Sequence, residues 1–370
     1  MNRSFIKILT TGAIAFTVLT IFIVMAIASS SSIGLLRGVN TLPSGTAFVP
    51  RQAPAMISLL ANPEQLYGIR QVTLPLSKRQ SDRQEWQQWT RDNFNKLGLN
   101  YQQLKPWLGE LTLAVTALDY DRNLNNGVQP GYLLAAKIKN TQLAKSLENF
   151  RPQKDIVSID RYKGANIVAY SPSAKTNIRS SAIVGNFVLF ANHPQIIREA
   201  INQAQAVNLN LEHSDKYLEA IANITQPRIA IAYIDVPKTL AWSNKSGVVE
   251  ANDKDVNRTL SAFLSIERKD LVAHTTLSNP ADPEAIFKVF QSLLKNSELE
   301  RVFEYLFLQE DNPNYIDLTA KTSSATQTPF YEVAKSAIKG LFPHLNAIAV
   351  KDKGSENKIG RTEILFKLDT

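Results

Sequence analysis

The sequence predicts an α+β protein with an N-terminal transmembrane helix, followed by a mainly antiparallel sheet with helices packed on one face. Three observations predict this fold: a long uncharged apolar segment, apolar runs that end in helix-capping residues, and segments of alternating polarity. The order of the segments fits a tandem duplication of a ferredoxin-like β-α-β-β-α-β unit. We therefore expect a transmembrane helix or signal anchor (1–30), a Ser- and Pro-rich stalk (31–50) and two α+β halves (51–226 and 227–370).

The transmembrane helix is predicted from 29 uncharged residues between Lys7 and Arg37. The apolar part, residues 8–28, would span about 31 Å as a helix, which matches the hydrocarbon thickness of a bilayer. A cleavable signal peptide is the alternative, because small residues precede Ser29. The apolar core is longer than that of an ordinary signal peptide, which favours a retained anchor. Basic residues such as Arg3 predict a cytoplasmic N-terminus, with the body on the far side of the membrane.

Recurrent strand-to-helix junctions predict where the helices begin. Five apolar runs end in Asn or Asp, most of them with a proline close by. The side-chain oxygen of Asn or Asp caps a helix start, and proline suits the first turn because its missing N–H would be unpaired there. Helices are therefore expected to begin near residues 63, 141, 194, 237 and 281. In the third junction, His193 is expected to occupy the cap position.

Alternation of apolar and polar residues predicts the strands between these junctions. The segment 110–118 alternates with period two, which is typical of a half-buried strand. Gly185-Asn186 separates two short apolar runs and predicts a tight hairpin. The expected strands are 55–61, 110–118 and 131–138 in the first half, and 228–234, 259–267 and 270–277 in the second.

The sequence indicates no catalytic residue, cofactor or metal ion. Among 370 residues there is no cysteine, which excludes thiolate metal sites and cysteine nucleophiles. The four histidines lack metal-binding spacing, and no nucleophile elbow, Walker loop or dinucleotide fingerprint occurs. The loop 119–125 has carboxylates and amides at alternate positions, as calcium loops do. Leu124 stands where an EF-hand requires Gly, and the same residue types are common in ordinary hairpin loops.

An uneven charge distribution predicts a surface that contacts a membrane or a partner. Residues 68–105 contain seven Lys or Arg against three acidic residues, within a chain of net charge +8. A basic helix with aromatic rings suits anionic headgroups or an acidic protein. The alternative is that the rings pack onto the sheet and the charges are only solvated. Nucleic-acid binding is not expected, since the basic residues match no recognised module. The candidate contact residues are Arg79, Arg83, Trp86, Trp89, Arg91 and Lys96.

Several short stretches together match one known family. They are Phe48-Val49-Pro50-Arg51-Gln52-Ala53-Pro54, Leu59-Leu60-Ala61-Asn62-Pro63, Pro106-Trp107-Leu108-Gly109-Glu110, Asp119 to Asp121, Pro130-Gly131-Tyr132-Leu133-Leu134 and Ala191-Asn192-His193-Pro194. From about residue 45 onwards, the chain resembles the domain-of-unknown-function family 3352, which is found mostly in cyanobacteria. The resemblance implies a membrane-anchored protein of uncharacterised activity in the plasma or thylakoid membrane, with the body in the periplasm or thylakoid lumen. It supplies no catalytic or binding residues.

Two functions from different classes follow. The first is a non-enzymatic binding or scaffold domain, held by its anchor beside a membrane complex. The second is a carrier of lipid or another apolar ligand, in which the sheet and its helices enclose a cavity. An enzyme with an unrecognised site is a third and weaker alternative. An apolar cavity that opens towards the stalk would favour the carrier, and an exposed apolar patch would favour the binding domain.

Overall fold

The structure is a computed structural model of the whole chain, and most of residues 40–278 can be described in it. The described residues are 40–60, scattered positions between 77 and 94, 99–123, 125–140, 142, 155–172, 178–222, 224–243, 258–267, 270–278, 315–317, 345–356 and 359–368. In this part of the chain, no helix has the length and hydropathy of a membrane span. The predicted span at 8–28 lies outside the described residues, as do the helix starts expected at 63, 141 and 281.

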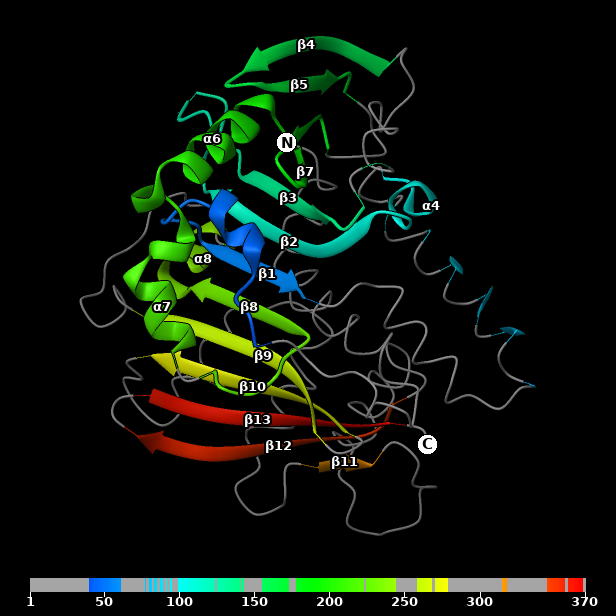
Figure 1. Cartoon of the computed structure of the whole chain (residues 1–370). Coiled ribbons are helices and arrows are strands. Elements are labelled where there is room, and N and C mark those ends of the chain that lie inside the picture. Colours follow the sequence, from blue (N-terminus) through cyan, green and yellow to red (C-terminus); the bar gives the residue numbers. More distant parts are fainter. Residues whose placement is uncertain are drawn as a thin grey trace.

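One antiparallel sheet of 13 strands forms the framework (Figure 1). Seven strands come from the first half of the chain: β1 (Ala55–Leu59), β2 (Leu108–Ala117), β3 (Gly131–Ile138), β4 (Ile156–Tyr162), β5 (Ala165–Tyr170), β6 (Ser180–Val184) and β7 (Phe187–Ala191). Six come from the second half: β8 (Ala230–Asp235), β9 (Thr259–Glu267), β10 (Asp270–Ser278), β11 (Tyr315–Asp317), β12 (Leu345–Glu356) and β13 (Ile359–Leu368). The predicted α+β class with a mainly antiparallel sheet is confirmed.

The strand order is repeated on the two sides of a central pair. The order across the sheet is β11-β12-β13-β10-β9-β8-β1-β2-β3-β7-β6-β5-β4. Strand β1 pairs with β8, so that the two halves share one sheet. From this pair outwards, β1-β2-β3-β7-β6 on one side corresponds to β8-β9-β10-β13-β12 on the other. This correspondence is the pattern that a duplicated chain would give.

The ferredoxin-like order predicted for each half is wrong. A ferredoxin-like unit inserts a third strand between its first two, because a helical crossover makes those two strands parallel. Here β1 and β2 are direct antiparallel neighbours, and so are β8 and β9. Each half therefore begins as a three-stranded meander, and a later hairpin joins its outer edge.

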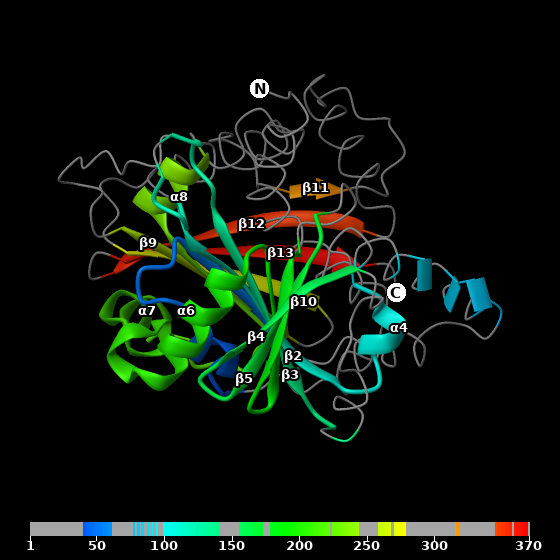
Figure 2. The same cartoon turned by 90° about the horizontal axis from the view of Figure 1, so that it is seen from above.

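Helices lie on both faces of the sheet, so the prediction that they pack on one face is also wrong. One face is covered by η2 (Ser44–Phe48), α6 (Pro194–Gln205), η4 (Val207–Leu209), η5 (Leu211–His213) and α7 (Asp215–Ile221). Figure 2 shows α6 and α7 together on one side of the strands. On the opposite face, α4 (Tyr101–Leu104) packs with Trp107 against β3 and β7. The alternation of β3 shows the two faces directly, since Leu133 lies in the α6 cluster and Leu134 in the α4 cluster.

The helices that begin at predicted junctions have the expected caps. Helix α6 begins at Pro194, and the ring Nδ1 of His193 accepts a hydrogen bond from the Gln195 amide at 3.2 Å. Helix α8 (Val236–Ser243) begins one residue before the expected position. The hairpin between β6 and β7 turns at Gly185, whose φ of +59° suits glycine because it has no Cβ.

Residues 40–50, expected to belong to the stalk, are part of the body in the structure. The helix η2 lies against the sheet with Phe48 buried, and the rings of Phe48 and Phe187 meet edge to face at 4.9 Å. A Cβ on Gly45 would lie 2.3 Å from Thr112 Oγ1, so only glycine allows this close approach. The chain therefore joins the sheet before it enters β1.

Candidate functional site

The predicted contact surface is described only in part. Arg83 and Arg91 are helical and exposed, as a surface role requires. Arg79, Trp86, Trp89 and Lys96 lie outside the described residues. The exposure of these two arginines fits both a contact surface and a solvated face, so the surface remains a prediction.

The acidic loop 119–125 uses its oxygen atoms to fold the loop. Asp121 Oδ1 accepts from the Asn123 amide at 3.0 Å, and Asp121 Oδ2 accepts from Asn126 Nδ2 at 2.7 Å. The side-chain hydrogen bond from Asn126 lowers the pKa of Asp121. Asp119 Oδ1 accepts from the Gln129 amide across the loop. Among the described residues, no group of three or more His, Cys, Asp or Glu is placed to hold a metal ion.

Two of the family-like stretches meet beside this loop. The Asn192 side chain accepts from the Tyr132 amide at 2.8 Å and donates to the Pro130 carbonyl at 2.8 Å. The next residue, His193, stacks on the Tyr120 ring with centroids 4.7 Å apart. Burial lowers the pKa of His193, and the positive charge of Arg179 lowers it further. This arrangement joins the start of β3 to the start of α6.

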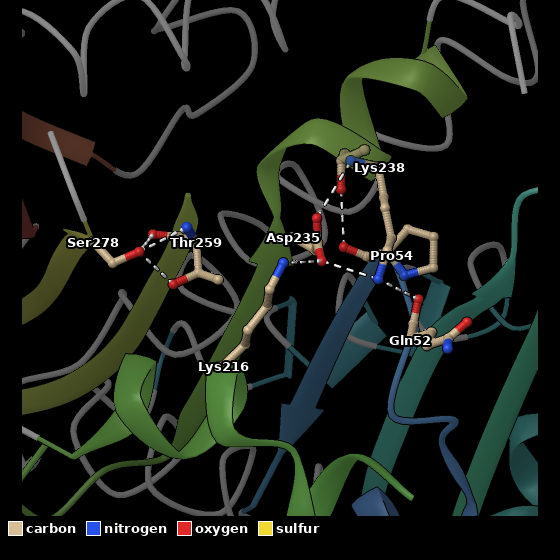
Figure 3. Close-up of polar contacts among 8 residues, drawn as sticks. Gln52, Pro54, Lys216, Asp235, Lys238, Thr259 and Ser278 are labelled. Atoms are coloured by element: carbon tan, nitrogen blue, oxygen red, sulfur yellow. Dashed lines mark hydrogen bonds and ion pairs between the residues drawn. The ribbon is translucent and has the colours of Figure 1, made fainter. Parts of the chain in front are cut away.

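A buried carboxylate joins two helices to the central strands (Figure 3). Asp235, at the end of β8, is 2% exposed. Its Oδ2 lies 3.0 Å from Lys238 Nζ on α8 and 3.7 Å from Lys216 Nζ on α7. The Asp235 amide donates to the Pro54 carbonyl at 2.8 Å, and Lys238 Nζ donates to the Gln52 carbonyl at 3.1 Å.

Asp235 therefore has a structural role. Its other oxygen, Oδ1, accepts from the Lys238 amide at 3.4 Å, which caps α8. The Thr239 hydroxyl adds a hydrogen bond to the Pro54 carbonyl at 2.9 Å. The sequence predicted Asp235 as a cap, but it gave no signal that Lys216 would reach the same carboxylate from another helix.

A second buried charged group, the guanidinium of Arg228, binds the first described residues of the chain. Arg228 is 3% exposed, and its Nη2 donates to the carbonyls of Asn40 at 3.0 Å and Thr41 at 3.3 Å. Its Nη1 donates to the carbonyls of Ile224 and Gln226. Four carbonyl oxygens thus surround one guanidinium group, and burial lowers its pKa. The sequence did not indicate this contact, because an isolated arginine before a strand has no distinguishing pattern.

The stretches that resemble the known family thus mainly connect elements of the fold to one another. Glu110 accepts from the Ser44 hydroxyl at 2.7 Å and from the Gly45 amide at 3.2 Å, which fixes η2 on β2. The Arg51 amide donates to the Leu209 carbonyl, and the Leu211 amide donates to the Val49 carbonyl, just before helix α7 in sequence. These residues connect η2, α6 and α7 to the sheet.

Comparisons with known proteins give one family and four matching chains among the solved structures. No curated protein matches the chain. Two crystal forms of the protein TP0453 match at 10% sequence identity. The first has a TM-score of 0.34 and covers 88% of this chain and 92% of that one; the second has a TM-score of 0.32 and covers 64% and 81%. These scores are too low to assign a common fold.

The family model for proteins of unknown function, DUF3352, matches residues 9–292. The matched region includes η2, all strands from β1 to β10 and each junction described above. The chain belongs to the DUF3352 family of proteins of unknown function.

Proposed function

We propose that the protein is a non-enzymatic binding or scaffold module with a single membrane anchor. Its N-terminus would lie in the cytoplasm and its body in the periplasm or the thylakoid lumen. The uncharged segment 8–28 supports the anchor, and the basic N-terminus supports the orientation. The likeness between the two halves of the sheet supports a duplicated origin, with the halves at 51–226 and 227–370.

The contact between Arg228 and the carbonyls of Asn40 and Thr41 carries this proposal. These carbonyls lie close after the proposed anchor, and a buried guanidinium binds both. Hydrogen bonds from a charged donor in a buried site are stronger than those between neutral groups. The chain is therefore attached to the body before it reaches η2. A body held in this way presents a constant face beside the membrane, which suits a scaffold more than a freely tethered carrier.

The test compares two arginine variants of the full chain in its native membrane. Arg228→Met removes the contact with residues 40 and 41, whereas Arg198→Gln removes an exposed ion pair with Asp160 on the α6 face. Both proteins are first shown to resist extraction by alkaline carbonate, and are then purified in mild detergent with their bound proteins and lipids.

We expect the wild type and Arg198→Gln to retain a defined membrane complex, and folded Arg228→Met to lose most of it. A chain that carbonate removes would contradict the anchor. Recovery of lipid alone in stoichiometric amount would instead support the carrier.

The proposed partner contact is the basic segment that contains Arg83 and Arg91. If an acidic protein or anionic lipid binds there, reversal of the four charges at Arg79, Arg83, Arg91 and Lys96 should abolish recovery of that partner. Each basic residue close to an anionic surface contributes about 1 kcal/mol to binding. Reversal of all four charges should therefore weaken binding more than reversal of any single charge. Wild-type recovery should also fall as salt is raised. Recovery that does not change with salt or with charge reversal would show that this segment is only a solvated face.

A further inference from the structure

Strand β4 has the two most exposed large apolar side chains of the described residues. Val157 is 67% exposed and Ile159 is 61% exposed. They lie two residues apart on the strand at one end of the sheet order, so that only β5 pairs with β4 among the described strands. Isolated exposed apolar side chains are common, but a close pair on an edge strand indicates a contact surface.

The contacts of β4 with α6 show which face carries these side chains. Asp160 forms an ion pair with Arg198 of α6, and the Tyr162 hydroxyl donates to Asn202 of α6 at 3.0 Å. Because neighbouring residues of a strand point to opposite faces, Ile159 and Arg161 lie on the face away from α6. Val157 is two residues before Ile159 in sequence, at a register shift between Ile156 and Ser158.

The charge around this apolar pair is basic. Arg161 is exposed on the same face as Ile159, and Asp160 is paired on the other face. Lys163 is exposed in the turn that follows the strand, and its Nζ lies 5.8 Å from the centroid of the Tyr162 ring. Residues 134–180 contain nine Lys or Arg against three acidic residues. The tight turn that follows β4 has φ of +46° at Lys163 and +85° at Gly164, which fixes the lysine at the end of the strand.

We propose that this face of β4 contacts the anionic surface of the membrane. Val157 and Ile159 would enter the interface, and Arg161 would bind lipid phosphates. The exposed side chain of Lys163 would turn away from the Tyr162 ring to bind them as well. The inference rests on the proposed membrane anchor and adds a second membrane contact on the body. The depth to which β4 can enter the bilayer is limited, because its outer edge pairs with no described strand and unpaired backbone groups are costly in hydrocarbon. The strand therefore lies at the level of the headgroups.

The experiment uses the full chain with single cysteines, since the sequence contains none. Ile159→Cys is labelled with an environment-sensitive fluorophore and the protein is reconstituted into vesicles. The vesicles contain phosphatidylcholine either alone or mixed with phosphatidylglycerol, together with lipids that carry a spin label near the headgroup. Leu218→Cys is the matched control, because Leu218 is an exposed apolar residue on α7, on the other face of the sheet.

We expect the spin label to quench the fluorophore at 159 in anionic vesicles, with little quenching in neutral vesicles or at 218. Arg161→Gln with Lys163→Gln should reduce the quenching at 159, because each charge lost weakens the contact of this face with lipid by about five-fold. Arg51→Gln is the control for charge, since Arg51 pairs with Asp215 of α7.

Equal quenching at 159 and 218, or quenching at 159 that does not depend on anionic lipid, would overturn the proposal. If the fluorophore at 159 becomes shielded from water without lipid, and more so as the protein concentration is raised, the surface binds a second copy of the chain. Quenching is measured before a carbonate wash. A chain that the wash removes would contradict the anchor but not the lipid contact at β4.

Discussion

Nη2 of Arg228 lies 3.0 Å from the carbonyl oxygen of Asn40, although 188 residues separate the two in sequence. The contact connects the segment that enters the body with the segment that leads into β8. Such a connection closes most of the first half into a loop. It therefore stabilises the fold through residues that belong to no regular element.

Arg228→Met should destabilise the protein by about 1.5–3 kcal/mol, because it removes a charged donor from four partly buried hydrogen bonds to carbonyls. The free energy of unfolding in urea measures this loss. Arg198→Gln should change it by less than about 1 kcal/mol, since its ion pair with Asp160 is exposed. Equal effects of the two substitutions would show that the Arg228 contacts add nothing to stability.

Asp235→Asn should cost about 1–3 kcal/mol, because the amide keeps the shape but loses the charge that two lysines share. The lysines are partly exposed and can regain water, which keeps the cost below that of a fully buried pair. Lys216→Met should cost less, since Lys238 remains as a partner. Urea unfolding of the three proteins gives the order, and a larger cost for Lys216→Met than for Asp235→Asn would refute this account.

Asn192→Ala should cost about 1–3 kcal/mol through the loss of two hydrogen bonds, to the Tyr132 amide and the Pro130 carbonyl. Thermal unfolding should show a lower Tm for this variant. Asn166→Ala, at an exposed position on β5, is the control and should leave Tm almost unchanged. If both variants behave alike, the junction between β3 and α6 does not depend on this side chain.

The depressed pKa of His193 predicts how stability depends on pH. Its folded pKa lies below the ordinary value of 6.5, so that the folded protein favours the neutral ring. The stability due to this group is present above pH 6.5. It is lost as the pH falls below 6.5 towards the folded pKa, because the unfolded chain binds a proton first. Nearby charges come from Arg179, Asp121 and Arg198.

His193→Asn should remove this part of the pH dependence and retain the helix cap, since Asn is among the best capping residues. The free energy of unfolding is measured at several pH values below neutrality for both proteins. The same slope in both would show that other groups cause the dependence.

Local patterns predicted several of the described strands well. The strands at 131–138 and 259–267 have the expected bounds, because a run of apolar residues bounded by turn residues determines a strand locally. The same holds for the start of α6, where His193 and Pro194 supply both capping signals. Here the sequence alone was sufficient.

Strand pairing could not be predicted in the same way. The same string of strands and helices fits both a ferredoxin-like order and the observed meander. The choice depends on contacts such as Met56 with Tyr233, which lie far apart in sequence. The Asp235 cluster shows the same limit, since its cap was predicted from neighbouring residues but its pairing with Lys216 depends on how α7 packs. Contacts between residues that are far apart in sequence leave no periodic pattern in the sequence.

The pairing of β1 with β8 has a consequence for folding during synthesis of the chain. Strand β1 consists of five buried residues, Ala55–Leu59, and is synthesised long before its partner at Ala230–Asp235. Until β8 is made, β1 can pair with β2 along one edge only, and its other edge is a template for aggregation. A truncated chain that ends before β8 should therefore need a chaperone to stay in solution, and the complete chain should shield that strand as soon as its own second half arrives.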